Sequence, residues 1–139
     1  MLTTDLIIIG AGPGGYETAL LAARRGLSVA LIERGEVGGT CLNEGCIPTK
    51  ALCRTAAMVS DFAEAEAFGI KDVAFTLDFP AVMERKRAVV KQLRDGVESL
   101  LSNPNIHLLR GEARFVDALT VEAAGERITA KDVIIATGS

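Results

Sequence analysis

Hydrophobic positions at the start of the chain alternate between strand and helix patterns. Residues 5–9 form a short continuous apolar run rich in β-branched side chains, which is typical of a buried parallel strand. An apolar, alanine-rich helical segment follows at 16–25 and stops at Gly26, a residue suited to a helix C-cap. A second apolar strand is predicted over 28–32. The opening of the chain therefore predicts a strand–helix–strand unit.

The middle of the chain carries two helical patterns. Apolar residues recur at three- and four-residue steps from Pro48 to Phe68, and Gly69 ends that pattern. Residues 70–79 predict a loop, and a long amphipathic helix is expected over 80–101. Its polar face includes a basic run, which we interpret as a solvated helix face because the whole chain is acidic.

The remaining segments predict strands. Short alternating patterns occupy 106–109, 112–116, 119–123 and 126–129, and from these we expect a small antiparallel meander. Another buried-strand pattern follows at 132–136, and the sequence ends three residues later. A core strand followed at once by a glycine-containing turn is an unusual natural terminus, so we expect this sequence to be part of a longer protein.

Length and composition narrow the functional classes. A chain of 139 residues with 49% apolar and 24% charged residues is typical of one globular domain. The net charge of −3 and an aromatic content of 4% argue against a nucleic-acid partner. We find no signal peptide and no uninterrupted apolar stretch that would span a membrane. Three cysteines without an export signal favour a reducing compartment, and we expect a cytoplasmic location.

A glycine-rich turn lies between the first predicted strand and the first predicted helix. Gly10, Gly12 and Gly15 fit the spacing G-x-G-x-x-G, which permits a tight turn, a close approach of a pyrophosphate and tight helix packing. Glu33 ends the second strand, where a carboxylate would bind a ribose hydroxyl. Strand, glycine turn, helix, strand and terminal acid together predict a dinucleotide site, and the acid disfavours a 2′-phosphate.

Two cysteines follow this unit closely. Cys41 and Cys46 are separated by four residues, and such a pair can cycle between dithiol and disulfide when the Cβ atoms approach to about 4 Å. A helix starting near Pro48 would stabilise the Cys46 thiolate and lower its pKa. Lys50 adds positive charge nearby. The pattern favours redox chemistry between a cofactor and a disulfide.

Other interpretations of the cysteines remain open at this point. A structural metal site needs about four ligands, whereas the chain offers three scattered cysteines and the single His107, so we expect no metal. Two inert buried cysteines beside a plain nucleotide-binding module are a second possibility. We expect Cys53 to be a core residue and His107 to be an ordinary strand residue.

The stretch from Gly38 to Lys50 (GGTCLNEGCIPTK) resembles the redox-active disulfide motif of the class I pyridine nucleotide-disulfide oxidoreductases, and within that family its dihydrolipoamide dehydrogenase branch. The resemblance covers the whole chain, from the IIIGAGPGG segment to the final IIATGS. It implies an α/β fold: a Rossmann-like FAD-binding domain with a parallel sheet, flanking helices and a small antiparallel meander. Residues 1–139 would be the N-terminal segment of that domain, and the NAD-binding and dimerisation domains would lie outside this sequence.

The resemblance also implies which residues hold the cofactor FAD. Glycines of the first turn would hold its pyrophosphate, Glu33 its adenosine ribose and the backbone of Ala113 its adenine. The implied cofactor-binding residues are Gly10, Gly12, Gly14, Gly15, Glu33, Arg34, Gly39, Thr40, Cys41, Lys50, Ala113, Thr137 and Gly138.

The implied reaction consists of two half-reactions. Dihydrolipoamide would exchange with Cys41, Cys46 would lie against the flavin as the charge-transfer thiol, and Lys50 would tune the flavin. Electrons would pass to NAD⁺ as co-substrate. Implied partners are the lipoyl-bearing acyl carriers of 2-oxo acid dehydrogenase or glycine cleavage complexes, with a homodimer at full length. A glutathione- or mercuric-reductase-like substrate is the alternative within the family, and we expect the 139 residues alone to be inactive.

Overall fold

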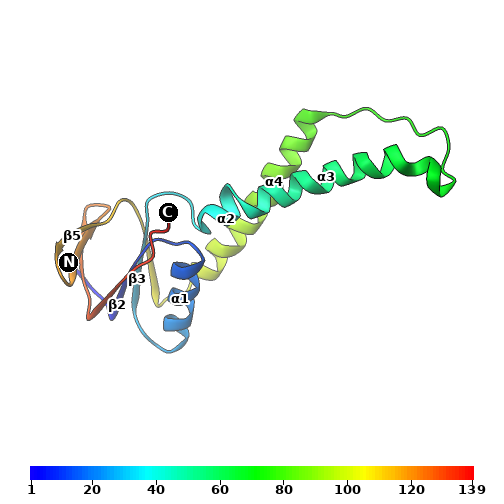
Figure 1. Ribbon diagram of the computed structural model, residues 1–139. Coiled ribbons are helices and arrows are strands. Elements are labelled where there is room, and N and C mark those ends of the chain that lie inside the picture. Colours follow the sequence, from blue (N-terminus) through cyan, green and yellow to red (C-terminus); the bar gives the residue numbers. More distant parts are fainter.

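The computed structural model describes all residues from Met1 to Ser139 and divides into a sheet body and a projecting helical arm (Figure 1). The elements in chain order are β1 (Leu2–Thr3), β2 (Leu6–Ile9), α1 (Pro13–Arg24), β3 (Val29–Glu33), α2 (Gly39–Asn43), α3 (Cys46–Glu64), the 3₁₀ helix η1 (Ala65–Phe68), α4 (Phe79–Leu101), β4 (Ile106–Arg110), β5 (Arg114–Asp117), β6 (Thr120–Ala123), β7 (Glu126–Thr129) and β8 (Asp132–Ile135).

A parallel sheet with the order β4-β3-β2-β8 forms the centre of the body. Because side chains alternate across a strand, successive residues of β2 enter different cores. Ile8 packs with α1 and the last turns of α4, whereas Ile7 packs with the second sheet on the opposite face. Both side chains are fully buried. The buried-strand pattern of the sequence thus reflects a sheet that is covered on both faces.

The second sheet has the order β1-β7-β6-β5. Strands β5, β6 and β7 form the expected antiparallel meander, and β1 pairs with β7 in the parallel direction. Val121 and Ile128 bury their side chains against Ile7 and Ile32 of the parallel sheet. The predicted fold class is therefore confirmed, with helices covering one face of the parallel sheet and the meander covering the other.

One strand expectation is wrong, and one strand was not predicted. The 106–109 segment is not part of the meander: as β4 it pairs in parallel with β3 and forms an edge of the central sheet. Its burial explains this position, because Ile106 packs on the helical side and Leu109 on the meander side. Strand β1 was not predicted, since two residues are too short to show a period.

The arm consists of α3, η1 and α4, and residues 69–78 join η1 to α4 at its far end (Figure 1). Helix α3 starts at Cys46, two residues earlier than expected, since Gly45 is its N-cap. Pro48 then lies in the first turn, where its missing N–H leaves no hydrogen bond unmade. Only Pro48 and Ala51 of α3 are buried. No helix in the chain has the length and apolar content needed to cross a membrane.

Candidate dinucleotide and disulfide site

The first glycine turn fixes how α1 meets the sheet. Gly10 has a positive φ of 102°, and a Cβ there would overlap the carbonyl group of Ala136 on β8's extension. A Cβ on Gly15 would overlap the carbonyl oxygen of Gly10. Only glycine fits at either position, so the turn brings the N-terminus of α1 against the ends of the parallel strands.

A second glycine turn faces the first one. Gly38 and Gly39 have positive φ values of 101° and 70°, and Gly38 donates its N–H to the Ala11 carbonyl at 2.8 Å. A Cβ on Gly39 would lie 2.9 Å from the Cα of Gly12, and one on Gly12 would lie 3.7 Å from the Cα of Gly39. The two turns thus present bare backbone to each other, a cradle suited to the close approach of a pyrophosphate.

Glu33 is placed at the mouth of this cradle. Its Oε2 accepts the Ala11 N–H at 2.7 Å, and its Oε1 accepts the Gly35 N–H at 2.8 Å. The peptide of Gly111 holds the main chain as well, since its N–H donates to the Glu33 carbonyl at 2.9 Å. The carboxylate is therefore fixed at the carboxyl end of β3, where ligands of doubly wound sheets bind.

Two adjoining cavities run along the carboxyl edge of the parallel sheet. The larger, of about 870 Å³, reaches from the glycine turns to Cys41, and the smaller, of about 290 Å³, reaches Ala113. They share Glu33 and Arg34 on one wall and Thr137 and Gly138 on the other. Together they form an elongated groove whose length joins the predicted adenine end to the disulfide.

Most of the predicted cofactor-binding residues line this groove. The structure brings together Gly10, Gly12, Gly14, Glu33, Arg34, Gly39, Thr40, Cys41, Ala113, Thr137 and Gly138. Gly15 lies buried beneath the turn, and Lys50 is exposed on α3 without lining either cavity. The roles of all these residues toward a ligand stay predictions.

The cysteine pair lies at the root of the arm. Cys41 in α2 and Cys46, the first residue of α3, are joined in a disulfide with their Cα atoms 4.7 Å apart. Both side chains are exposed, and Cys41 lines the larger cavity whereas Cys46 does not. Since Cys46 begins a helix of 19 residues, the helix dipole would favour its thiolate after reduction.

The other two candidate residues lie away from the disulfide. Cys53 is a free thiol that is exposed on α3, so the expectation of a core residue is wrong. Nothing in this chain covers that part of the helix, and helical spacing alone could not show this. His107 is a residue of β4, as expected. No group of three or more His, Cys, Asp or Glu side chains comes close enough to hold a metal ion.

Asn43 and Arg94 line the wall of the larger cavity. The Asn43 amide donates to the carbonyls of Val37 and Gly39 at 2.9 and 3.0 Å, which holds the second glycine turn onto α2. Its Oδ1 and the Arg94 Nε are shielded from solvent without a hydrogen-bond partner within the chain.

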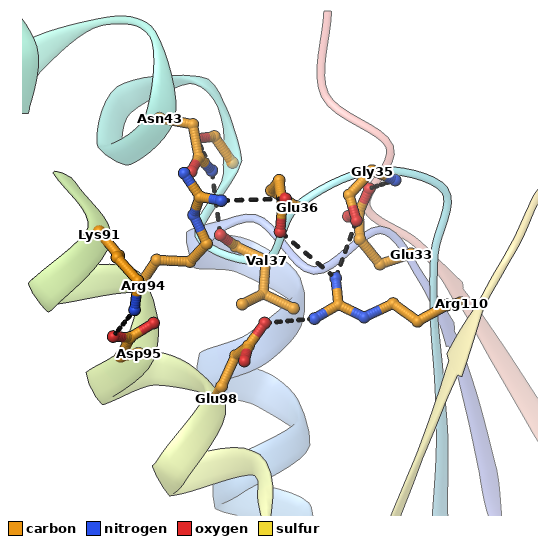
Figure 2. Close-up of polar contacts among 11 residues, drawn as sticks. Glu33, Gly35, Glu36, Val37, Asn43, Lys91, Arg94, Asp95, Glu98 and Arg110 are labelled. Atoms are coloured by element: carbon orange, nitrogen blue, oxygen red, sulfur yellow. Dashed lines mark hydrogen bonds and ion pairs between the residues drawn. The ribbon is translucent and has the colours of Figure 1, made fainter. Parts of the chain in front are cut away.

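A charged cluster that the sequence did not reveal holds the loop after Glu33 (Figure 2). Arg94 of α4 pairs with Glu36 at 2.9 Å. Arg110 of β4 donates to the Gly35 carbonyl at 2.8 Å and pairs with Glu98 of α4. The loop at Gly35 and Glu36 is far in sequence from α4 and β4, so only the parallel pairing of β4 with β3 would have pointed to this cluster.

The acidic residue with the most strongly shifted pKa, Asp5, lies outside the groove. A hydrogen bond from Lys131, together with hydrogen bonds from Ser28, holds the pKa of Asp5 well below its usual range. The same contact with Asp5 raises the pKa of Lys131. Asp5 precedes β2 at the amino end of the parallel strands, and the pair therefore serves the fold rather than the groove.

Comparison with known proteins agrees with this geometry. The sequence pattern of the pyridine nucleotide-disulphide oxidoreductases matches residues 4–139. Dihydrolipoyl dehydrogenases from Chlamydia muridarum and Thermus scotoductus are 45% and 48% identical to 97% and 100% of this chain, which spans 30% of each relative's length. The solved Cu(II) complex of the HOCl-induced flavoprotein disulfide reductase RclA from Escherichia coli superposes with a TM-score of 0.79 at 32% identity, over 99% of this chain and 29% of that one. The chain therefore belongs to the pyridine nucleotide-disulphide oxidoreductase family, whose members are FAD-dependent enzymes with a pyridine nucleotide as co-substrate.

Proposed function

We propose that this chain forms the FAD- and disulfide-bearing segment of a flavoenzyme that oxidises dihydrolipoamide. The observation that carries the proposal is that Cys41 of the disulfide lines the same cavity as the facing turns at Gly12 and Gly39. A dinucleotide in that groove would have its reactive end beside the disulfide. The relatives named dihydrolipoyl dehydrogenase support the choice of substrate.

The residues that line the groove support FAD as its ligand. The bare turns at Gly12 and Gly39 would take the pyrophosphate, the fixed carboxylate of Glu33 would take the adenosine ribose, and the backbone at Ala113 would take the adenine. Arg34, Thr40, Thr137 and Gly138 are proposed to complete the walls. When bound, FAD supplies a two-electron acceptor that can pass a hydride to NAD⁺.

The residues of the chain supply the thiol chemistry. A dihydrolipoamide thiolate attacks the Cys41 Sγ, and the bond to Cys46 breaks with Cys46 leaving as a thiolate. The second substrate thiol then attacks the mixed disulfide and releases Cys41, so the substrate becomes a disulfide and the cysteine pair holds two electrons. The N-terminus of α3 stabilises the leaving thiolate, and Lys50, one turn later, adds positive charge at that end of the helix.

We also propose that these 139 residues are part of a longer protein, which carries the wider activity. The chain spans about 30% of the length of its curated relatives. Reduction of NAD⁺, homodimerisation, a cytoplasmic location and service to lipoyl-bearing acyl carriers of 2-oxo acid dehydrogenase or glycine cleavage complexes are proposed for that longer protein. We expect the chain by itself to show no NAD⁺-linked turnover, and a steady-state assay with dihydrolipoamide would check this.

The thiol step can be tested on the oxidised chain without any flavin. Anaerobic dihydrolipoamide should yield about one equivalent of lipoamide per chain, while Cys41→Ser and Cys46→Ser should yield none because neither variant holds the disulfide. Cys53→Ser is the matched control and should match the parent, since Cys53 is exposed outside the pair. A disulfide that reacts no faster with dihydrolipoamide than with dithiothreitol, a dithiol of similar reducing power, would contradict the proposed substrate, and one that resists both dithiols would contradict the redox role.

A further inference from the structure

Arg110 lies in register with Glu33 on the neighbouring strand but forms no ion pair with it. Parallel pairing of β3 with β4 sets Glu33 and Arg110 in register, and in-register residues of neighbouring strands project to the same face. The Arg110 guanidinium nevertheless donates to the Gly35 carbonyl at 2.8 Å and pairs with Glu98. A second carboxylate, that of Glu36, lies 4.0 Å away (Figure 2).

Glu33 and Arg110 hold opposite sides of the same residue. The Gly35 N–H donates to the Glu33 carboxylate at 2.8 Å, while the Gly35 carbonyl accepts from Arg110. The other Glu33 oxygen accepts the Ala11 N–H of the first glycine turn. Since each carboxylate oxygen can accept two hydrogen bonds, both oxygens keep capacity for a ligand as long as no cation occupies them.

We propose that Glu98 and Glu36 retain Arg110 on the Gly35 carbonyl, which positions the Glu33 carboxylate and keeps it free of an ion pair, so that it can bind the two hydroxyls of a dinucleotide ribose. Arg110 is thus a positioning residue for the ribose subsite. The inference rests on the proposed function, since it concerns the same dinucleotide groove. It adds residues from α4 and β4 that make no contact with the cavity at Ala113.

The charges around Arg110 explain why a cluster is required. Glu36, Glu98 and Arg110 have side chains that are 54%, 43% and 42% exposed, and single exposed ion pairs contribute little. Arg94, which is 27% exposed, pairs with Glu36 and holds it beside Arg110. Glu36 and Glu98 therefore compete together with the in-register Glu33 for the Arg110 guanidinium. Either carboxylate alone would compete less well.

The test compares ADP with 2′,3′-dideoxy-ADP by calorimetry on the 139-residue chain. The parent should prefer ADP, and Glu33→Gln should abolish that preference. Arg110→Gln releases the Gly35 carbonyl, and Glu98→Gln frees Arg110 to pair with Glu33. Each should reduce the preference by roughly tenfold, the effect of weakening one hydrogen bond to a charged group. Arg87→Gln is the matched control, because it breaks the Arg87–Glu84 pair on α4 without touching the loop. A purely structural role of Arg110 would weaken both nucleotides equally.

Two further measurements, on the Arg110→Gln/Glu98→Gln double variant and on amide hydrogen exchange, test whether Glu98 acts through Arg110 and whether Arg110 holds the loop. Glu98→Gln should add nothing to Arg110→Gln, because Glu98 acts only through Arg110. Without ligand, Arg110→Gln should speed hydrogen exchange at the Ala11 and Gly35 amides, and Arg87→Gln should not.

The outcomes separate the inference from the function it rests on. A full ADP preference or unchanged exchange in Arg110→Gln would overturn the inference and leave the cofactor groove standing. A parent that binds neither nucleotide would overturn both the inference and the proposed cofactor site.

Discussion

The sheet body and the helical arm carry equally clear hydrophobic patterns but bury them very differently. In the body, Ile7, Ile8 and Leu31 are 0% exposed and are covered from both faces. In the arm, apolar side chains such as Phe68 and Phe79 are 78% and 59% exposed. Periodicity therefore predicts which element forms, whereas burial depends on which other elements are present to cover it.

The candidate site lies where these two regions meet. Its glycine turns and Glu33 are fixed by the body, through backbone contacts that admit no side chain at Gly10 or Gly15. Its disulfide joins α2 to the first residue of α3, at the root of the arm. The chemistry thus sits on a rigid dinucleotide groove beside a helix that contributes its N-terminus but little buried surface.

The largest difference between the body and the arm should be seen in the free energy of unfolding when one apolar side chain of each region is truncated to alanine. Ile8→Ala should lower the free energy of unfolding by about 2–5 kcal/mol, because its fully buried side chain packs from the sheet against α1 and the end of α4. Phe68→Ala should change it by less than about 0.5 kcal/mol, since the ring is largely exposed. Urea unfolding of both variants checks this. A Phe68→Ala cost equal to that of Ile8→Ala would mean that the arm is packed as tightly as the body.

A smaller effect should come from two glycines. Gly15→Ala should cost about 1–3 kcal/mol through overlap with the Gly10 carbonyl, and should also weaken ADP binding. Gly96→Ala in α4 meets nothing within 4 Å and should stabilise the chain by up to about 1 kcal/mol through helix propensity. Thermal melts and ADP titrations of the pair provide the measurement. Tolerance of Gly15→Ala with intact ADP binding would show that the first turn is less constrained than its geometry indicates.

The smallest effect concerns pH and the amino edge of the body. The folded-state pKa of Asp5 lies below its unfolded value of about 3.9, so its stabilising contribution is present above that pH and is lost as the pH falls through the folded pKa. Asp5→Asn should therefore lower the Tm at pH 7, and the gap should narrow below about pH 4. Melts of both proteins at pH 7 and pH 3 measure it. A gap that is equal at both values would exclude the ionised contact with Lys131 as its source.

Much of the fold was predictable because local patterns specified it. The run before Gly10, the glycine spacing and the acid at Glu33 predicted the first strand, turn, helix and strand, and the meander was recognised from short alternating segments. The pairing partner of β4 was not predictable, because the apolar spacing of Ile106 and Leu109 does not say which strand lies beside them.

The candidate site was predictable only in its linear motifs. The turns and the cysteine pair could be identified because each is compact in sequence. The exposure of Cys53 could not, since it depends on what covers α3. Arg110 and Glu98 were missed because their relation to Glu33 arises from strand register and from the return of α4 to the body.

We propose that one groove holds a flavin dinucleotide against the Cys41–Cys46 pair. The visible absorption spectrum of the chain with FAD, recorded at equilibrium before and after a stoichiometric dithiol, tests it most directly. We expect a saturable shift of the flavin band and a new long-wavelength band on reduction, which Cys46→Ser should lack. A flavin spectrum identical to that of free FAD before and after reduction would contradict it.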